Sequence, residues 1–253
     1  MIWRANFNTS KMIFIYFLYI FFGILPSLAW LFYYLKKDLH PESKKMILKI
    51  FLWGSFTTIP VYLVQKLLTI LLFSINPPLI FISLIYGFII IAFTEELFKY
   101  LVIKFKVLSN SACDEPIDIM IYMIISALGF AAVENIFYIV SSAINLPIND
   151  AVFASVVISL SRFLGATFLH TLCSALVGYF VILSIIKTKN NLRYTILGIL
   201  TATLLHGLFN LSIMKIELNW LIILIPIIIL ISLAIFVISK FEKVKKIKSI
   251  CKI

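Results

Sequence analysis

Two adjacent carboxylates and a lysine lie inside a long apolar stretch, as Glu95-Glu96-Leu97-Phe98-Lys99 within residues 79–105. A charge at the centre of a membrane helix costs roughly 2.5–3.5 kcal/mol on insertion scales, so such residues are usually kept for a function. A carboxylate that is shielded from water beside a second acid is a candidate general base, able to take a proton from a water molecule. The rest of the chain must therefore supply partners for these charges.

Those partners are found in other apolar stretches. Of the 11 acidic residues, only Glu95, Glu96 and Glu134 lie inside such stretches. His170 and His206 also lie near the middle of apolar stretches. We therefore expect these carboxylates and imidazoles to meet in one polar centre at mid-membrane depth.

Amides and a guanidinium accompany them. Asn135 follows Glu134, Asn210 lies one helical turn after His206, and Arg162 begins the stretch that contains His170. The small residues before Glu134 favour close approach of helices. Tyr138 is expected one turn beyond Glu134 on the same side.

The spacing of the charges predicts different roles for the two adjacent glutamates. Glu95 and Lys99 are four residues apart and share a helix face, so we expect Lys99 to neutralise Glu95. Glu96 points about 100° away and would then be the freer carboxylate. Both stay candidates for the catalytic base.

Two hydrolytic chemistries fit this set. In the first, a glutamate activates water, and imidazole and amide donors hold the oxyanion of a tetrahedral intermediate. In the second, Glu95, Glu134, His170 and His206 bind zinc. Either would hydrolyse an amide bond. No serine or cysteine stands in a recognisable nucleophile motif.

Two other classes of protein would use the same residues differently. A non-catalytic scaffold or binding subunit could hold the charges as structural ion pairs, and a proton-coupled transporter also places carboxylates and histidines mid-membrane. The lack of two pseudo-symmetric halves counts against a transporter.

Composition places the chain in a membrane. It has 253 residues, of which 62% are hydrophobic and 13% charged. The formal charge of +11 comes from basic residues between apolar stretches, which indicates topology signals and lipid contacts and no nucleic-acid partner. We predict an all-α bundle with about seven spans, at 12–35, 46–73, 79–105, 118–142, 162–186, 194–213 and 219–239.

One region does not fit a simple count of spans. Residues 150–187 contain no proline and would form a helix of about 55 Å, far longer than a bilayer core. Residues 151–161 are therefore expected to form a separate, interfacial helix. Residues 1–253 are interpreted as one membrane domain with its core at about 80–212 and a basic tail at 240–253.

Basic residues predict the orientation. They gather after the first, third, fifth and last spans, so the positive-inside rule places the C-terminus in the cytoplasm of a bacterial or archaeal cell, in its plasma membrane. No pattern indicates an oligomeric state.

Four short motifs, in order, resemble the PrsW family of intramembrane proteases, within the wider group that contains the CAAX-processing endopeptidases and Abi-type membrane proteins. They are Glu95-Glu96-Leu97-Phe98-Lys99, Gly129-Phe130-Ala131-Ala132-Val133-Glu134-Asn135, Arg162 through His170, and His206-Gly207-Leu208-Phe209-Asn210. The position of Lys99 favours the PrsW branch over prenyl-protein processing, which stays the alternative protease reading.

The resemblance implies a glutamic-type protease that cleaves a membrane-anchored protein, such as an anti-sigma factor, with no cofactor expected and zinc as the alternative. Glu95 or Glu96 would activate water with help from His170. His206 and Asn210 would form the oxyanion site. The supporting residues would be Lys99, Glu134, Asn135 and Arg162.

Overall fold

The computed structural model describes residues 2–37, 40–188, 192–215 and 219–247, and every regular element within them is a helix. The predicted all-α class is therefore confirmed. The elements in chain order are α1 (Ile2–Leu35), α2 (Lys44–Phe56), α3 (Thr58–Ile75), α4 (Leu79–Leu84), the π-helix η1 (Ile85–Phe93), α5 (Thr94–Lys106), α6 (Pro116–Ala143), α7 (Ile148–Leu164), α8 (Ala166–Thr188), α9 (Leu192–Lys215), the 3-10 helix η3 (Trp220–Ile223) and α10 (Leu224–Val244).

Seven stretches of the described residues are long and apolar enough to cross a membrane. They agree with the predicted spans to within a few residues at most ends; the predicted span 118–142, for example, is Pro116–Ala143. The last helix is longer than expected, because α10 continues to Val244 into the predicted basic tail. The rest of that tail, from residue 248, lies outside the described residues.

Helix α6 is the centre of the bundle. Of its most apolar window, 94% is buried, and it packs against α1, α2 and α8. The crossing with α2 is close because Gly54 and Gly129 face each other's helix, where a Cβ on either would overlap the backbone opposite. Ser55 Oγ donates a hydrogen bond of 2.9 Å to the Gly129 carbonyl at this crossing.

The expected break between residues 150 and 187 is present. It falls at Gly165, whose φ of −103° and ψ of −96° end α7 and leave α8 to start at Ala166. The predicted helix 151–161 is therefore part of a longer one, α7. Ala151, Ser155 and Ser159 bury one face of α7, against α1 and α6. Its interfacial position stays a prediction.

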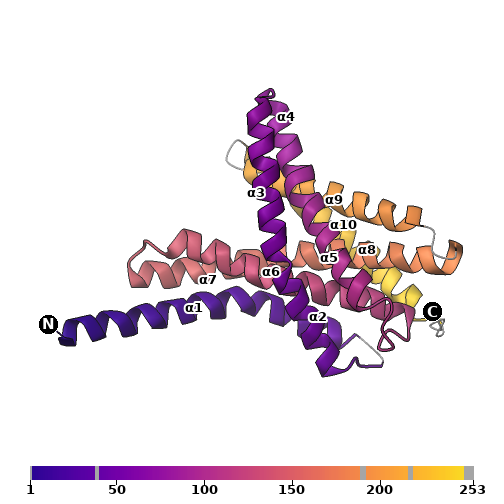
Figure 1. The fold of residues 1–253 in the computed structure, drawn as a ribbon, viewed down its shortest axis with the longest axis horizontal. Coiled ribbons are helices and arrows are strands. Elements are labelled where there is room, and N and C mark those ends of the chain that lie inside the picture. The colour runs from indigo at the N-terminus through magenta and orange to yellow at the C-terminus, as the bar shows by residue number, and fades with distance from the viewer. Residues whose placement is uncertain (1, 38–39, 189–191, 216–218, 248–253) are drawn as a thin grey trace.

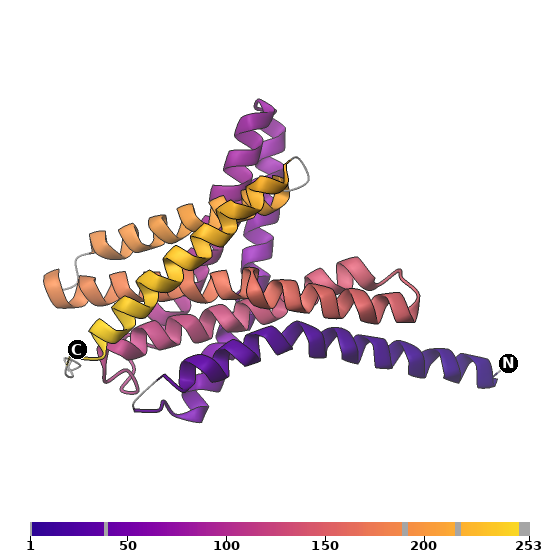
Figure 2. The same cartoon turned by 180° about the vertical axis from the view of Figure 1, so that it is seen from behind.

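The helices α1, α6, α7 and α8 lie side by side, whereas the hairpin of α3 with α4 and η1 stands away from them (Figure 1). Seen from behind, α10 runs diagonally across α8 and α9 (Figure 2). Helices α6, α8 and α9 all contact α5, whose first turn carries Glu95 and Glu96. The predicted site residues Glu134, His170 and His206 lie on α6, α8 and α9.

Candidate active site

The adjacent Glu95 and Glu96 lie in the first turn of α5, directly after the π-helix η1. Thr94 Oγ1 donates hydrogen bonds of 2.5 and 3.0 Å to the Ile90 and Ile91 carbonyls at this junction. Wide π turns often occur at functional sites because they change the direction of the following side chains. Glu95 and Glu96 are both buried, at 4% and 0% exposed.

Glu96 is the paired carboxylate. Its Oε1 accepts a hydrogen bond of 2.6 Å from Lys99 Nζ and lies 2.9 Å from His206 Nδ1. The expectation that Lys99 would neutralise Glu95 is wrong, and so is the inference that Glu96 is the freer acid. Residues three apart on a helix are also neighbours, and here this spacing, together with the histidine on α9, draws Glu96 inward.

His170 continues the chain of contacts to a second carboxylate. Its Nδ1 lies 2.9 Å from Lys99 Nζ, and its Nε2 lies 2.8 Å from Glu134 Oε2. A lysine ammonium can only donate, so we assign Nδ1 as the acceptor and place the ring proton on Nε2, which donates to Glu134. Glu134 also pairs with Arg162 Nη2, at 2.7 Å.

Arg162 is held in place on α7 by its neighbours. Its Nε donates to Asn135 Oδ1, and its guanidinium lies 4.1 Å from the centre of the Tyr138 ring. Asn135 Nδ2 in turn donates hydrogen bonds of 3.1 Å to the Gly23 carbonyl and to Thr167 Oγ1. Asn135 therefore joins α1, α6, α7 and α8 behind the charged residues.

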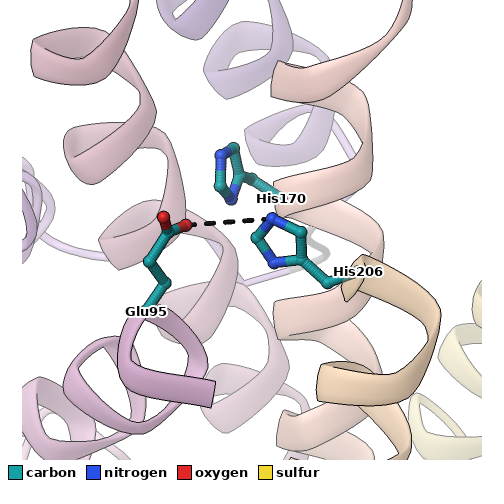
Figure 3. A group of neighbouring side chains, drawn as sticks. All are labelled: Glu95, His170 and His206. Carbon is teal, nitrogen blue, oxygen red and sulfur yellow. Dashed lines mark ion pairs between the residues drawn. The ribbon is translucent and has the colours of Figure 1, made fainter. Parts of the chain in front are cut away.

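Glu95 differs from Glu96 and Glu134 in having no lysine or arginine partner among the described residues, although the Oε2 of Glu96 is also without a hydrogen bond. The Oε1 of Glu95 accepts a weak hydrogen bond of 3.4 Å from Gln65 Nε2, whereas its buried Oε2 has no hydrogen-bond partner among the described residues. Oε2 faces His206 Nε2 at 3.8 Å, too long for a hydrogen bond (Figure 3). In neutral His206 the Nδ1 proton is donated to Glu96, so Nε2 offers a lone pair to this gap.

The structure brings together most of the predicted residues, but not all. The rings of His170 and His206 lie 5.0 Å apart in an edge-to-face arrangement. Asn210 is half-buried on α9 and makes no hydrogen bond to any described residue, so its oxyanion role stays a prediction.

Gln65 is the contact that the sequence interpretation missed. Gln65 is not among the predicted site residues, yet from α3 it reaches Thr94 Oγ1 at 3.3 Å as well as Glu95. An amide side chain inside a predicted span was the available signal.

Part of the predicted zinc set converges. Glu95, His170 and His206 each offer a ligand atom within 4.8 Å of the others. The free oxygen of Glu95 and the lone pair of His206 suit a divalent cation, whereas His170 would first have to release Lys99 or Glu134. Glu134 is outside this group and contacts His170, as carboxylates that orient metal-ligating histidines do.

Carboxylates and imidazoles that meet inside a bundle of candidate spans are the arrangement expected of a membrane-embedded hydrolase. Residues 42–238 match the family described as "PrsW family intramembrane metalloprotease". The chain therefore belongs to the PrsW family of intramembrane proteases, as its four motifs predicted.

Curated relatives support this assignment along most of the chain. The chain is 29% identical to Protease PrsW of Oceanobacillus iheyensis, over 74% of this chain and 79% of that protein. It is 29% identical to Protease PrsW of Clostridioides difficile, over 83% and 84%, and 24% identical to that of Bacillus subtilis, over 81% and 86%. No solved structure matches. The chain is thus a multi-pass bacterial membrane protease.

Proposed function

We propose that this protease hydrolyses a peptide bond of a membrane-anchored protein with a water molecule activated by Glu95. One observation carries the proposal. Of the three carboxylates at the centre of the bundle, Glu96 is paired with Lys99 and Glu134 with Arg162, whereas no lysine or arginine among the described residues pairs with Glu95. A carboxylate without a cation keeps its affinity for a proton, which a general base requires.

The water would be held beside Glu95 Oε2 and His206 Nε2, within hydrogen-bond reach of both atoms. Its two hydrogens would be bonded to these two acceptors, and its oxygen lone pair would attack the scissile carbonyl. Glu95 would take the proton as the oxygen–carbon bond forms. It would return that proton to the amine nitrogen when the carbon–nitrogen bond breaks.

The developing oxyanion needs donors. Because the neutral His206 has no proton on Nε2, we assign this task to the amide of Asn210, and we assign His206 to hold the water. Removing one such donor typically reduces the rate by about 10²–10³. A row of hydrogen bonds fixes the His206 ring and its tautomer; it runs through Glu96, Lys99, His170 and Glu134.

A divalent metal is compatible with the same residues. Glu95 and His206 would hold it, with His170 after exchange of one hydrogen bond, and a bound metal supplies Lewis acidity and a more acidic water. The purified protease should be assayed after chelation, with zinc content measured on the same sample. Activity without zinc would favour the glutamate alone, and activity that returns only with metal would favour the metal.

The family and the position of the site within candidate spans support a membrane-anchored substrate. A membrane-anchored regulator, such as an anti-sigma factor, would present a bond to this site. To test this, protein N-termini in membranes of a strain that lacks the protease are compared after complementation with the wild type or Glu95→Gln. We expect new N-termini in one or more anchored proteins with the wild type only.

The matched control is Lys45→Gln, which alters an exposed lysine on α2 and should behave as the wild type. Identical N-termini in all strains would contradict proteolysis. If Glu95→Gln then also reduced the amount of folded protein, the non-catalytic scaffold would be the better interpretation.

A further inference from the structure

A cavity of about 450 Å³ lies between α1, α8 and α10, beside the break between α7 and α8. This volume is within the range of small-molecule sites, roughly 300–1,000 Å³. Its walls are mainly aromatic and aliphatic, and none of the charged residues of the active site lines it.

The aromatic wall is held rigidly. Trp30 stacks on Phe163 and Phe168, with ring centroids 5.2 and 4.4 Å apart, and its Nε1 donates a hydrogen bond of 2.9 Å to the Phe163 carbonyl. Tyr34, one turn along α1, is fixed through a hydrogen bond of 3.1 Å with Thr171. The cavity is thus built from pinned side chains.

Two opposite charges line the same cavity. Lys37 follows the end of α1, and Glu242 lies in the last turn of α10. No ion pair among the described residues joins them; Lys37 lies over the Tyr33 ring at 5.4 Å, and Glu242 makes only an exposed contact of 3.5 Å with Lys245. A cation and an anion are therefore both available to a ligand.

The two ends of the cavity differ in depth. Lys37 and Glu242 lie beyond or at the ends of candidate spans on the side where basic residues gather, which is the depth of lipid headgroups. Trp30, Phe168 and Ala234 lie within spans, at hydrocarbon depth. A ligand that fits must have one zwitterionic end and one long apolar end.

We propose that this cavity binds one phospholipid with a phosphoethanolamine headgroup, its phosphate at Lys37, its ammonium at Glu242 and an acyl chain along Trp30. A purely anionic lipid would satisfy Lys37 but would place its charge beside the Glu242 carboxylate. The cavity and the active site both adjoin the α7–α8 break. Thr171, which bonds Tyr34 of the cavity, directly follows His170, and Phe163, whose carbonyl accepts from Trp30, directly follows Arg162. The bound lipid would therefore hold this break in its observed shape.

The test uses the full chain, purified in detergent and titrated with phosphatidylethanolamine or phosphatidylglycerol carrying identical brominated acyl chains, which quench nearby tryptophan. Subtracting the signal of Trp30→Phe isolates Trp30 from the other tryptophans. We expect phosphatidylethanolamine to quench Trp30 at about fivefold lower concentration, since one headgroup charge contributes about this factor.

Variants of Lys37 and Glu242 test which lipid headgroup charge each side chain binds. Lys37→Gln should weaken phosphatidylethanolamine quenching about fivefold, and Glu242→Gln should remove the preference between the two lipids. Ala234→Phe, which fills the cavity, should abolish the quenching, whereas Lys45→Gln on the same basic side should change nothing. Equal quenching by both lipids in the wild type, no quenching by either, or a preference that survives Glu242→Gln would overturn the proposal.

Discussion

The molecule has two clusters of acidic residues, and they are built in opposite ways. Glu42, Asp114 and Asp118 gather near the start of α6, with carboxylate oxygens within 4.8 Å of one another. There, Asp118 Oδ2 accepts hydrogen bonds of 3.0 and 2.7 Å from the backbone N–H groups of Asp114 and Glu115, and Tyr122 donates to Glu42. This cluster closes the end of a helix with a capping box.

The cluster of Glu95, Glu96 and Glu134 uses the same residue type at the centre of the bundle. Lys99 on the same helix balances Glu96, and Arg162 on α7 balances Glu134. The Oε2 atoms of Glu95 and Glu96 have no hydrogen-bond partner among the described residues. Buried polar atoms are nearly always satisfied, so an open carboxylate oxygen indicates a place for water or substrate. The comparison therefore separates a helix-capping cluster from the cluster that we propose to be catalytic.

The largest effect should come from the open carboxylate. Glu95→Gln removes the proton acceptor with little change in shape, and we expect cleavage to fall by about 10³-fold, within the range for lost general-base catalysis. Measured per folded molecule in membranes, cleavage by this variant should be at background. Cleavage near the wild-type rate would mean that the open oxygen is not the base.

Lys99 tests the paired carboxylate. Lys99→Met leaves Glu96 buried without its cation, which should destabilise the protein by roughly 3–5 kcal/mol and reduce its accumulation. The double variant Glu96→Gln with Lys99→Met removes both charges and should recover most of that stability. Thermal unfolding in detergent measures both. A double variant no more stable than Lys99→Met would show that the pair does not act as a unit.

A variant of Gln65 tests whether this residue belongs to the proposed catalytic cluster. Gln65→Leu removes the amide beside Glu95, and we expect cleavage to slow by about tenfold with unchanged unfolding temperature, because a hydrogen bond to a charged group contributes roughly 1.5–3 kcal/mol and this one is long. The neighbouring Lys66→Gln, on the exposed side of α3, is the control. Equal rates in both variants would place Gln65 outside the site.

The smallest effect belongs to the helix cap. Asp118→Ala should lower stability by about 1 kcal/mol, as lost caps do, and leave cleavage per folded molecule unchanged. Unfolding temperature and cleavage measured on one preparation test this. Loss of cleavage without loss of stability would mean that the cluster of Glu42, Asp114 and Asp118 also has a function, which would contradict the distinction between the two clusters.

The spans and the meeting of four polar helices could be predicted from the sequence, because apolar length and buried charge are properties of single stretches. The pairing could not. Lys99 can reach an acid three or four residues before it, and only the π-helix η1 and the position of His206 on α9 decide for Glu96. The contact of Gln65 with Glu95 likewise depends on how α3 lies against α5, which no local pattern specifies.

The most direct measurement compares cleavage of an identified anchored substrate by wild type, Glu95→Gln and Glu95→Asp, each corrected for folded protein in the membrane. If Glu95 is the base, the glutamine variant should be inactive, and the aspartate variant, which keeps an acid on a shorter arm, should retain a reduced but measurable rate. A glutamine variant as active as the aspartate variant would contradict the account.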